Sequence, residues 1–177
     1  MTVEELRARL TKYMMNDLTL RSPLVAVEVR LKATDNTRCR YEVLLIDEDG
    51  QETEVKFPDR CSRLIYIYAL LHPQGFQRRK AAANDYLALR QLYSKLYFRD
   101  DAALLKTIRS TDEKRPGQFF CHYVTQSRRA IRETSPLAMP FAIDRPQRNN
   151  SLLLIPFVAE GGTVILDSSL SNNMSNL

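Results

Sequence analysis

The residues with the clearest chemical potential lie in one arginine-rich segment, Gln118 to Glu133. At helical spacing, Phe120, Val124 and Ile131 share one face with Ser127 between them, which predicts a helix that packs on a core. The polar side chains that project elsewhere are those of Thr125, Gln126, Arg128, Arg129 and Arg132. Their outer face is strongly basic. It is either a binding surface or a solvated face with local ion pairs, and Arg129 and Glu133 have the i,i+4 spacing for such a pair.

Basic residues are concentrated in the middle of the chain, which includes the arginine-rich segment. The sequence has 177 residues and a formal net charge of +5. Residues 1–60 carry 10 basic and 12 acidic side chains, residues 61–150 carry 16 and 7, and residues 151–177 carry 0 and 2. A basic middle predicts one face of positive potential, which would attract nucleic acid or an acidic protein surface. A charge balance that serves solubility alone is the alternative.

Residues that could support catalysis or hold a metal ion are few. The three cysteines, Cys39, Cys61 and Cys121, form no CxxC pair, and the chain has 2 histidines. Cys121 and His122 are adjacent, but neighbours on a helix point about 100° apart, which is poor for proton transfer. The five glycines have no phosphate-loop spacing. We therefore expect reduced cysteines and a protein that is not an enzyme and needs no cofactor or metal.

Alternation of apolar and polar residues predicts antiparallel strands in the first third of the chain. Val25–Leu31 has the period of two of a half-buried strand, and two further strands are expected over Arg40–Ile46 and Glu52–Phe57. The acidic tetrad Asp47–Gly50 between the last two suits a hairpin turn. It lacks the ligand spacing and distal Glu of a calcium loop, so we expect a turn there and not a calcium site.

A short amphipathic helix is expected before the strands, from about Val3 to Asn16. Thr2 and Glu5 have the spacing of a capping box, and a stripe of leucines and methionines follows them. We expect this stripe to pack on the chain's own sheet. The alternative is a homodimer that forms through the same helix.

Helical periodicity dominates the middle of the chain. Arg63–Leu71 is apolar almost all round, which predicts a buried central helix that His72–Gly75 ends. A second helix is capped by Asn84 or Asp85, and its apolar positions are Leu89, Leu92, Tyr93, Leu96 and Tyr97. Asp101–Arg109 predicts a further short helix.

Extended chain is expected beyond the arginine-rich segment. Pro136 and Pro140 bound a loop, and the polar basic tip Arg145–Asn150 precedes a strand over Leu152–Val158. Another strand covers Thr163–Leu166. We expect three parts: an N-terminal helix in residues 1–21, one α+β domain in residues 22–167, and a frayed polar tail in residues 168–177.

This order of elements resembles the winged helix-turn-helix output domains of bacterial response regulators. One segment looks like that family's first helix and the residues that end it. It consists of Val55-Lys56-Phe57, then Pro58-Asp59-Arg60-Cys61-Ser62-Arg63 and an apolar helix closed by His72-Pro73-Gln74-Gly75. Tyr123–Arg132 is similar to its recognition helix, where an aromatic residue or His and a branched apolar residue precede arginine-rich turns. The resemblance covers about Val25–Leu166.

The resemblance implies a fold and a function. The fold is an N-terminal helix and antiparallel strands, then a winged helix-turn-helix with an extra helix and a C-terminal β-hairpin wing. The function is that of a transcription regulator that binds double-stranded DNA, with arginine reading guanine and glutamine reading adenine in the major groove. The implied contacts are Gln126, Arg128, Arg129 and Arg132 on the helix, with His122 secondary, Arg145 and Arg148 in the wing, and Arg78 and Arg79 at the DNA backbone.

The competing function is a protein–protein interaction module that keeps this fold without binding DNA. Tyrosines are dense on the middle helices, at Tyr66, Tyr68, Tyr86, Tyr93 and Tyr97. Exposed tyrosines would suit a protein interface, whereas buried ones would belong to the core. We expect no receiver domain before the winged-helix pattern, because the first 20 or so residues are too few to form one. A regulator of this type would then take its signal from a partner protein or from dimerisation.

The chain is not expected to enter a membrane. Its longest apolar run is the eight residues Leu64–Leu71, whereas a spanning helix needs about 20. The acidic start Met1–Glu5 is unlike a secretory signal, which begins with basic residues. We expect a cytoplasmic protein.

Overall fold

The computed structural model describes residues 2–5, 8, 22–32, 40–77, 83–97, 100–113, 115, 117–145 and 152–171. The expected capping box is present, because the Thr2 backbone N–H donates to Glu5 Oε2 over 2.8 Å and the Glu5 N–H donates to Thr2 Oγ1 over 3.2 Å. Most of the helix predicted to reach Asn16 lies outside the described residues, and so do three of the predicted site residues, Arg78, Arg79 and Arg148.

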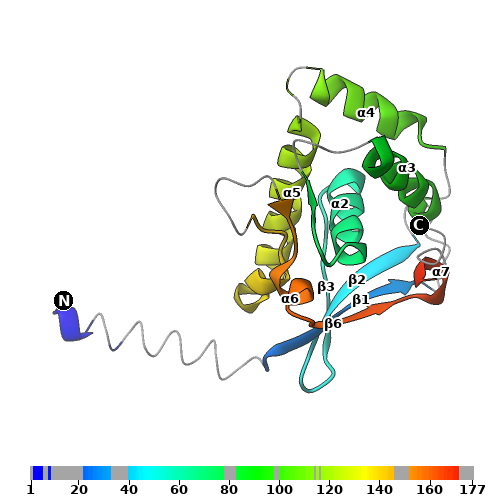
Figure 1. The fold of residues 1–177 in the computed structure, drawn as a ribbon. Coiled ribbons are helices and arrows are strands. Elements are labelled where there is room, and N and C mark those ends of the chain that lie inside the picture. Colours follow the sequence, from blue (N-terminus) through cyan, green and yellow to red (C-terminus); the bar gives the residue numbers. More distant parts are fainter. Residues whose placement is uncertain are drawn as a thin grey trace.

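A four-stranded sheet in the order β3-β2-β1-β6 forms the base of the fold (Figure 1). Strands β1 (Leu24–Leu31), β2 (Tyr41–Asp47) and β3 (Glu52–Glu54) are antiparallel neighbours, as the sequence predicts. The first two are close to their predicted ranges, whereas β3 covers only the first half of Glu52–Phe57. Strand β6 (Thr163–Leu166), also predicted as a strand, pairs with β1 in parallel, so the sheet is mixed.

The predicted alternation of β1 holds only at its centre. Val27 and Val29 are fully buried, whereas Val25 is 40% and Leu31 42% exposed. The pairing of β1 with β2 shifts register between Leu24 and Ala26, and this irregularity turns Ala26, and not Val25, into a buried position.

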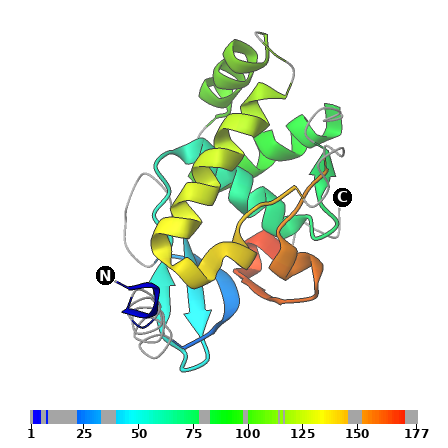
Figure 2. The same cartoon turned by 90° about the vertical axis from the view of Figure 1, so that its left-hand side faces the viewer.

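Helix α2 (Arg60–Leu71) is the central helix that the sequence predicts. Its residues from Leu64 to Leu70 are at most 3% exposed. The Tyr66 hydroxyl, which lies in this buried run, donates to the Phe141 carbonyl over 2.8 Å and thereby satisfies its polar group. In Figures 1 and 2, α2 lies between the sheet, α3 (Ala83–Tyr97) and α5 (Gln118–Thr134), so it is the element on which the other helices pack.

The start of α2 gives a direct test of this fold. Asp59 is its N-cap, and its carboxylate accepts the Ser62 N–H over 2.7 Å. Because that N–H has no partner within the helix, we expect Asp59→Ala to lower the free energy of unfolding by about 1 kcal/mol. Urea denaturation followed by circular dichroism measures the change. Asp59→Asn retains a capping oxygen and should cost clearly less, and equal losses in the two variants would contradict the capping role.

The extra helix is present as α4 (Ala102–Asp112), which extends past the predicted end at Arg109. Leu104 and Ile108 are buried, at 1% and 8% exposed, and Leu105 is half-buried. Helix α4 thus also includes Ser110–Asp112, and α5 begins at Gln118 as predicted.

The segment after α5 differs most from the sequence prediction. The expected loop between Pro136 and Pro140 is part of the 3₁₀ helix η1 (Pro136–Phe141). The strand predicted over Leu152–Val158 is confined to β5 (Leu152–Leu153), because Pro156 begins the short helix α6 (Pro156–Ala159). Residues Ser168–Ser171, expected as frayed tail, form α7, and Leu170 is buried in the core.

A second, two-stranded sheet joins the middle of the chain to its C-terminal part. Strand β4 (Phe76–Gln77), which follows α2, pairs antiparallel with β5. Leu154 in turn pairs antiparallel with Asp144, so the two described segments that flank residues 146–151 lie side by side; we call this pair of segments the hairpin. Gly75 permits this arrangement: its φ is 85°, and a Cβ there would lie 2.6 Å from the Leu153 carbonyl oxygen.

Candidate nucleic-acid interface

The N-terminus of α5 is held by a carboxylate from the preceding helix. Gly117, the N-cap, has a φ of 79° and no side chain that could accept a hydrogen bond. Asp112 supplies the acceptor instead: its Oδ1 accepts the Phe119 N–H over 2.9 Å, and its Oδ2 accepts the Tyr86 hydroxyl over 2.6 Å. A carboxylate at a helix N-terminus also complements the helix dipole. Asp112 therefore fixes where α5 begins relative to α3 and α4.

The inner face of α5 is the one that the sequence predicts. Phe120 and Ile131 are fully buried, Val124 is 7% exposed, and Ser127 lies between them at 0%. The Ser127 hydroxyl has no hydrogen-bond partner in the described part of the chain. The apolar face packs α5 against α2 and leaves the opposite face open to solvent.

The exposed face of α5, which faces the viewer in Figure 2, is formed by residues at helical spacing. We call it the α5 outer face; its residues are His122, Thr125, Arg129 and Arg132. Gln126 and Arg128 are half-buried on either side of it. Of the four α5 contacts that the resemblance implies, two are thus fully presented to solvent and two lie at the margins.

Two of the arginines on α5 form ion pairs with different consequences. Arg129 Nε lies 2.8 Å from Glu133 Oε1, with side chains 65% and 61% exposed, so the pair is weak and opens readily. The carboxylate of Glu133 raises the pKa of Arg129, which stays charged. Arg128 Nη1 lies 3.2 Å from Asp144 Oδ1 and so joins α5 to the base of the hairpin. Arg132 forms no ion pair within the described residues.

Arg145 in the hairpin is the one other predicted contact residue that lies in the described part of the chain. Arg145 is exposed, and its backbone N–H donates to Asp144 Oδ1 over 2.8 Å. The same carboxylate oxygen contacts Arg128. One acidic side chain therefore connects α5 with the start of the predicted wing tip, and places Arg145 near the turn of α5 that carries Arg128.

Sequence patterns could not identify Asp112 and Asp144. Asp112 caps a helix that begins six residues later, which no local capping motif describes. Asp144 is separated from Arg128 by 16 residues, and the contact depends on the path of η1 between them. Both residues act through tertiary contacts.

The environment of the Cys61 thiol favours its protonated, less nucleophilic form. Cys61 is reduced, and burial beside Asp59 raises its pKa to about 11. Burial also raises the pKa of Tyr123, which hydrogen-bonds to Cys61, to about 12. Among the described residues, no group of three histidine, cysteine or carboxylate side chains is placed to hold a metal ion.

The tyrosines of the middle helices belong mainly to the core. Tyr66, Tyr68, Tyr93 and Tyr97 are at most 3% exposed, and Tyr86 is half-buried. Tyr97 is typical: its ring packs at 4.9 Å from that of Tyr93, and its hydroxyl donates to the Arg60 carbonyl over 2.9 Å. These side chains hold α2, α3 and α5 together.

No family model matches this chain, and no curated protein or solved structure is significantly similar to it. We therefore infer the function from the geometry of the described residues. Among the described helices, none is long and apolar enough to cross a lipid bilayer.

Proposed function

We propose that this protein binds double-stranded DNA by placing the α5 outer face in the major groove. The observation that carries the proposal is the presentation of Arg129 and Arg132 on one exposed helical face, beside the hairpin that carries Arg145. Arginine pairs with phosphate and with the guanine edge through the same planar donor geometry. A helix of 17 residues that packs through one face and exposes the other suits the width of the groove.

The connectivity supports a winged-helix interpretation of this interface. Helix α2 is followed by the short strand β4, then by α3, α4 and α5, and then by the hairpin between Asp144 and Leu154. Because β5 pairs with β4, the hairpin lies beside the helices and does not project from a distant site. In the proposed complex, Arg145 and the wing-tip Arg148 contact phosphate or the minor groove, and Arg78 and Arg79 contact the backbone.

The roles of the residues on α5 follow from their exposure. Arg129 and Arg132 make the primary contacts, and the Glu133 pair opens when Arg129 meets a phosphate. Gln126 contacts bases from the margin of the face. Arg128 orients the hairpin through Asp144 and reaches phosphate only if that ion pair is exchanged. Regulation of transcription is the use that we propose for this binding.

Salt dependence of duplex binding tests the proposal. Fluorescence anisotropy with random-sequence duplex DNA should show affinity that falls steeply as salt rises, because each neutralised phosphate contributes about −0.9 to the log–log slope. In Arg129→Gln with Arg132→Gln, two contacts are lost and the slope should become less steep by about 1.8.

A matched control removes the same charge from elsewhere. Arg90→Gln with Lys95→Gln lies on α3, which is on the other side of α2 from the α5 outer face in Figures 1 and 2. We expect the slope of this control to stay close to that of the wild type. Absence of wild-type binding at low salt, with the protein folded, would reject DNA binding and favour the protein-interaction module. Equal losses in both double variants would reject α5 as the interface.

A further inference from the structure

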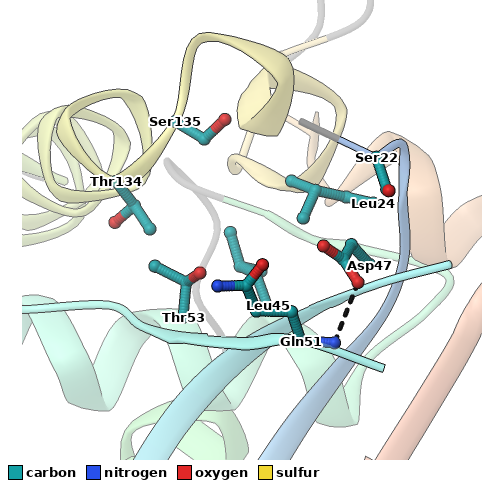
Figure 3. A pocket seen from close by; sticks show the side chains of 8 residues that line it. All are labelled: Ser22, Leu24, Leu45, Asp47, Gln51, Thr53, Thr134 and Ser135. Atoms are coloured by element: carbon teal, nitrogen blue, oxygen red, sulfur yellow. Dashed lines mark hydrogen bonds between the residues drawn. The ribbon is translucent and has the colours of Figure 1, made fainter. Parts of the chain in front are cut away.

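A polar pocket of about 270 Å³ lies where the β2–β3 hairpin meets the end of α5 (Figure 3). Leu45, Asp47, Gln51 and Thr53 come from the hairpin, Ser22 and Leu24 from the chain that enters β1, and Thr134 and Ser135 from the end of α5. The side chains converge from three segments that are distant in sequence. The pocket is therefore a product of the tertiary fold, and its volume lies just below the range of about 300–1,000 Å³ that is usual for small-molecule sites, so it suits only a small ligand.

The pocket has an electronegative lining. Of the described residues that line it, Asp47 is the one that carries a charge, and none is a lysine, an arginine or a histidine. Helix α5 ends at Thr134, so the negative end of the helix dipole lies at the same place. Both features favour a cation over an anion.

Hydrogen-bonding capacity remains available in this lining. Asp47 Oδ1 accepts the N–H groups of Asp49 and Gln51 over 2.9 and 2.8 Å, which orients the carboxylate and leaves its other oxygen without a partner in the described chain. The side chains of Gln51 and Thr53 are likewise without partners among the described residues, and both point toward the pocket in Figure 3. A ligand with several N–H donors would satisfy these oxygens together.

We propose that this pocket binds a small ligand that carries a protonated amine or guanidinium group. The Asp47 carboxylate pairs with the cation, and the hydroxyl and amide oxygens accept its remaining N–H groups. Leu24, which is half-buried, supplies apolar surface for a short aliphatic stem, and the fully buried Leu45 lies beneath the pocket. This site is separate from the α5 outer face, because Thr134 follows Thr125 by nine residues and so lies on the opposite side of the helix. The inference does not depend on DNA binding.

Calorimetric titration with agmatine, which carries both cationic groups on a four-carbon stem, tests the site. We expect binding to the full chain with a dissociation constant of about 1 mM or tighter. Asp47→Asn keeps the oxygen that accepts the turn N–H groups and removes the charge, so it should weaken binding by about tenfold or more. Glu48→Gln is the matched control, because Glu48 lies in the same exposed turn and does not line the pocket; its affinity should match the wild type.

A second variant and a neutral ligand test the same site independently of Asp47→Asn. Thr53→Val removes one exposed hydroxyl that does not support the fold, and should weaken agmatine binding even if Asp47→Asn proves unstable. The neutral analogue 1,4-butanediol should bind far more weakly than agmatine. No binding of agmatine to the wild type, equal binding of the diol, or equal losses in Asp47→Asn and Glu48→Gln would overturn the assignment.

Discussion

Replacing Phe120 with alanine is expected to lower the free energy of unfolding by about 3–5 kcal/mol. Phe120 is fully buried, and its ring centroid lies 5.6 Å from that of Phe76 and 5.8 Å from that of Tyr86. It therefore joins α5 to β4 and to α3 at once. Truncation would remove these aromatic contacts and leave a cavity that the surrounding rings cannot fill without moving. Chemical denaturation monitored by circular dichroism measures the loss.

Two further variants separate the cavity from a general effect of mutation. Leu87→Ala removes an apolar side chain from α3 that is 49% exposed, and should change stability by no more than about 0.5 kcal/mol. Phe120→Leu fills most of the site and should cost less than alanine. If Phe120→Ala and Leu87→Ala were equally mild, α5 would not be docked on the core as described, and its outer face would not be a fixed surface.

The elements with strong local patterns could be predicted from the sequence. The run that forms α2 is apolar almost all round, which predicts burial, whereas the apolar stripe and basic face of α5 recur at helical period and so predict both its type and its orientation. The Asp47–Gly50 turn was predictable because its hydrogen bonds are local: the Asp47 carboxylate accepts backbone N–H groups from residues at most four positions away. In these cases the decisive contacts are close in sequence or depend only on burial.

The contacts that complete the candidate site could not be predicted in this way. Strand β6 pairs with β1 across more than 130 residues, and a run such as Thr163–Leu166 does not specify a parallel neighbour. The strand predicted over Leu152–Val158 stops before Pro156, because proline at the first helical position favours the start of α6. The Arg128–Asp144 ion pair, which joins α5 to the hairpin, depends on the path that η1 gives to the chain between the two residues. The arrangement of charged side chains at the candidate site thus depends on contacts between residues that are distant in sequence.

Asp112 gives the second large prediction, because one carboxylate supports three helices. Asp112→Ala should lower the free energy of unfolding by about 2–3 kcal/mol, since it removes the acceptor for the Phe119 N–H and for the Tyr86 hydroxyl. Gly117 has no side chain that could replace it as a cap. Denaturant titration of purified protein measures the loss.

A double-mutant cycle shows whether the carboxylate acts through these contacts. Tyr86→Phe removes one of the two hydrogen bonds and should cost about 1 kcal/mol in the wild type but clearly less in Asp112→Ala, because the partner oxygen is already absent. Asp112→Asn keeps an acceptor for Phe119 and should fall between the wild type and alanine. Strictly additive losses would mean that Tyr86 and Asp112 are energetically independent. The start of α5 would then be fixed by the burial of Phe119 and Phe120 alone, and duplex binding would not need the Asp112 cap.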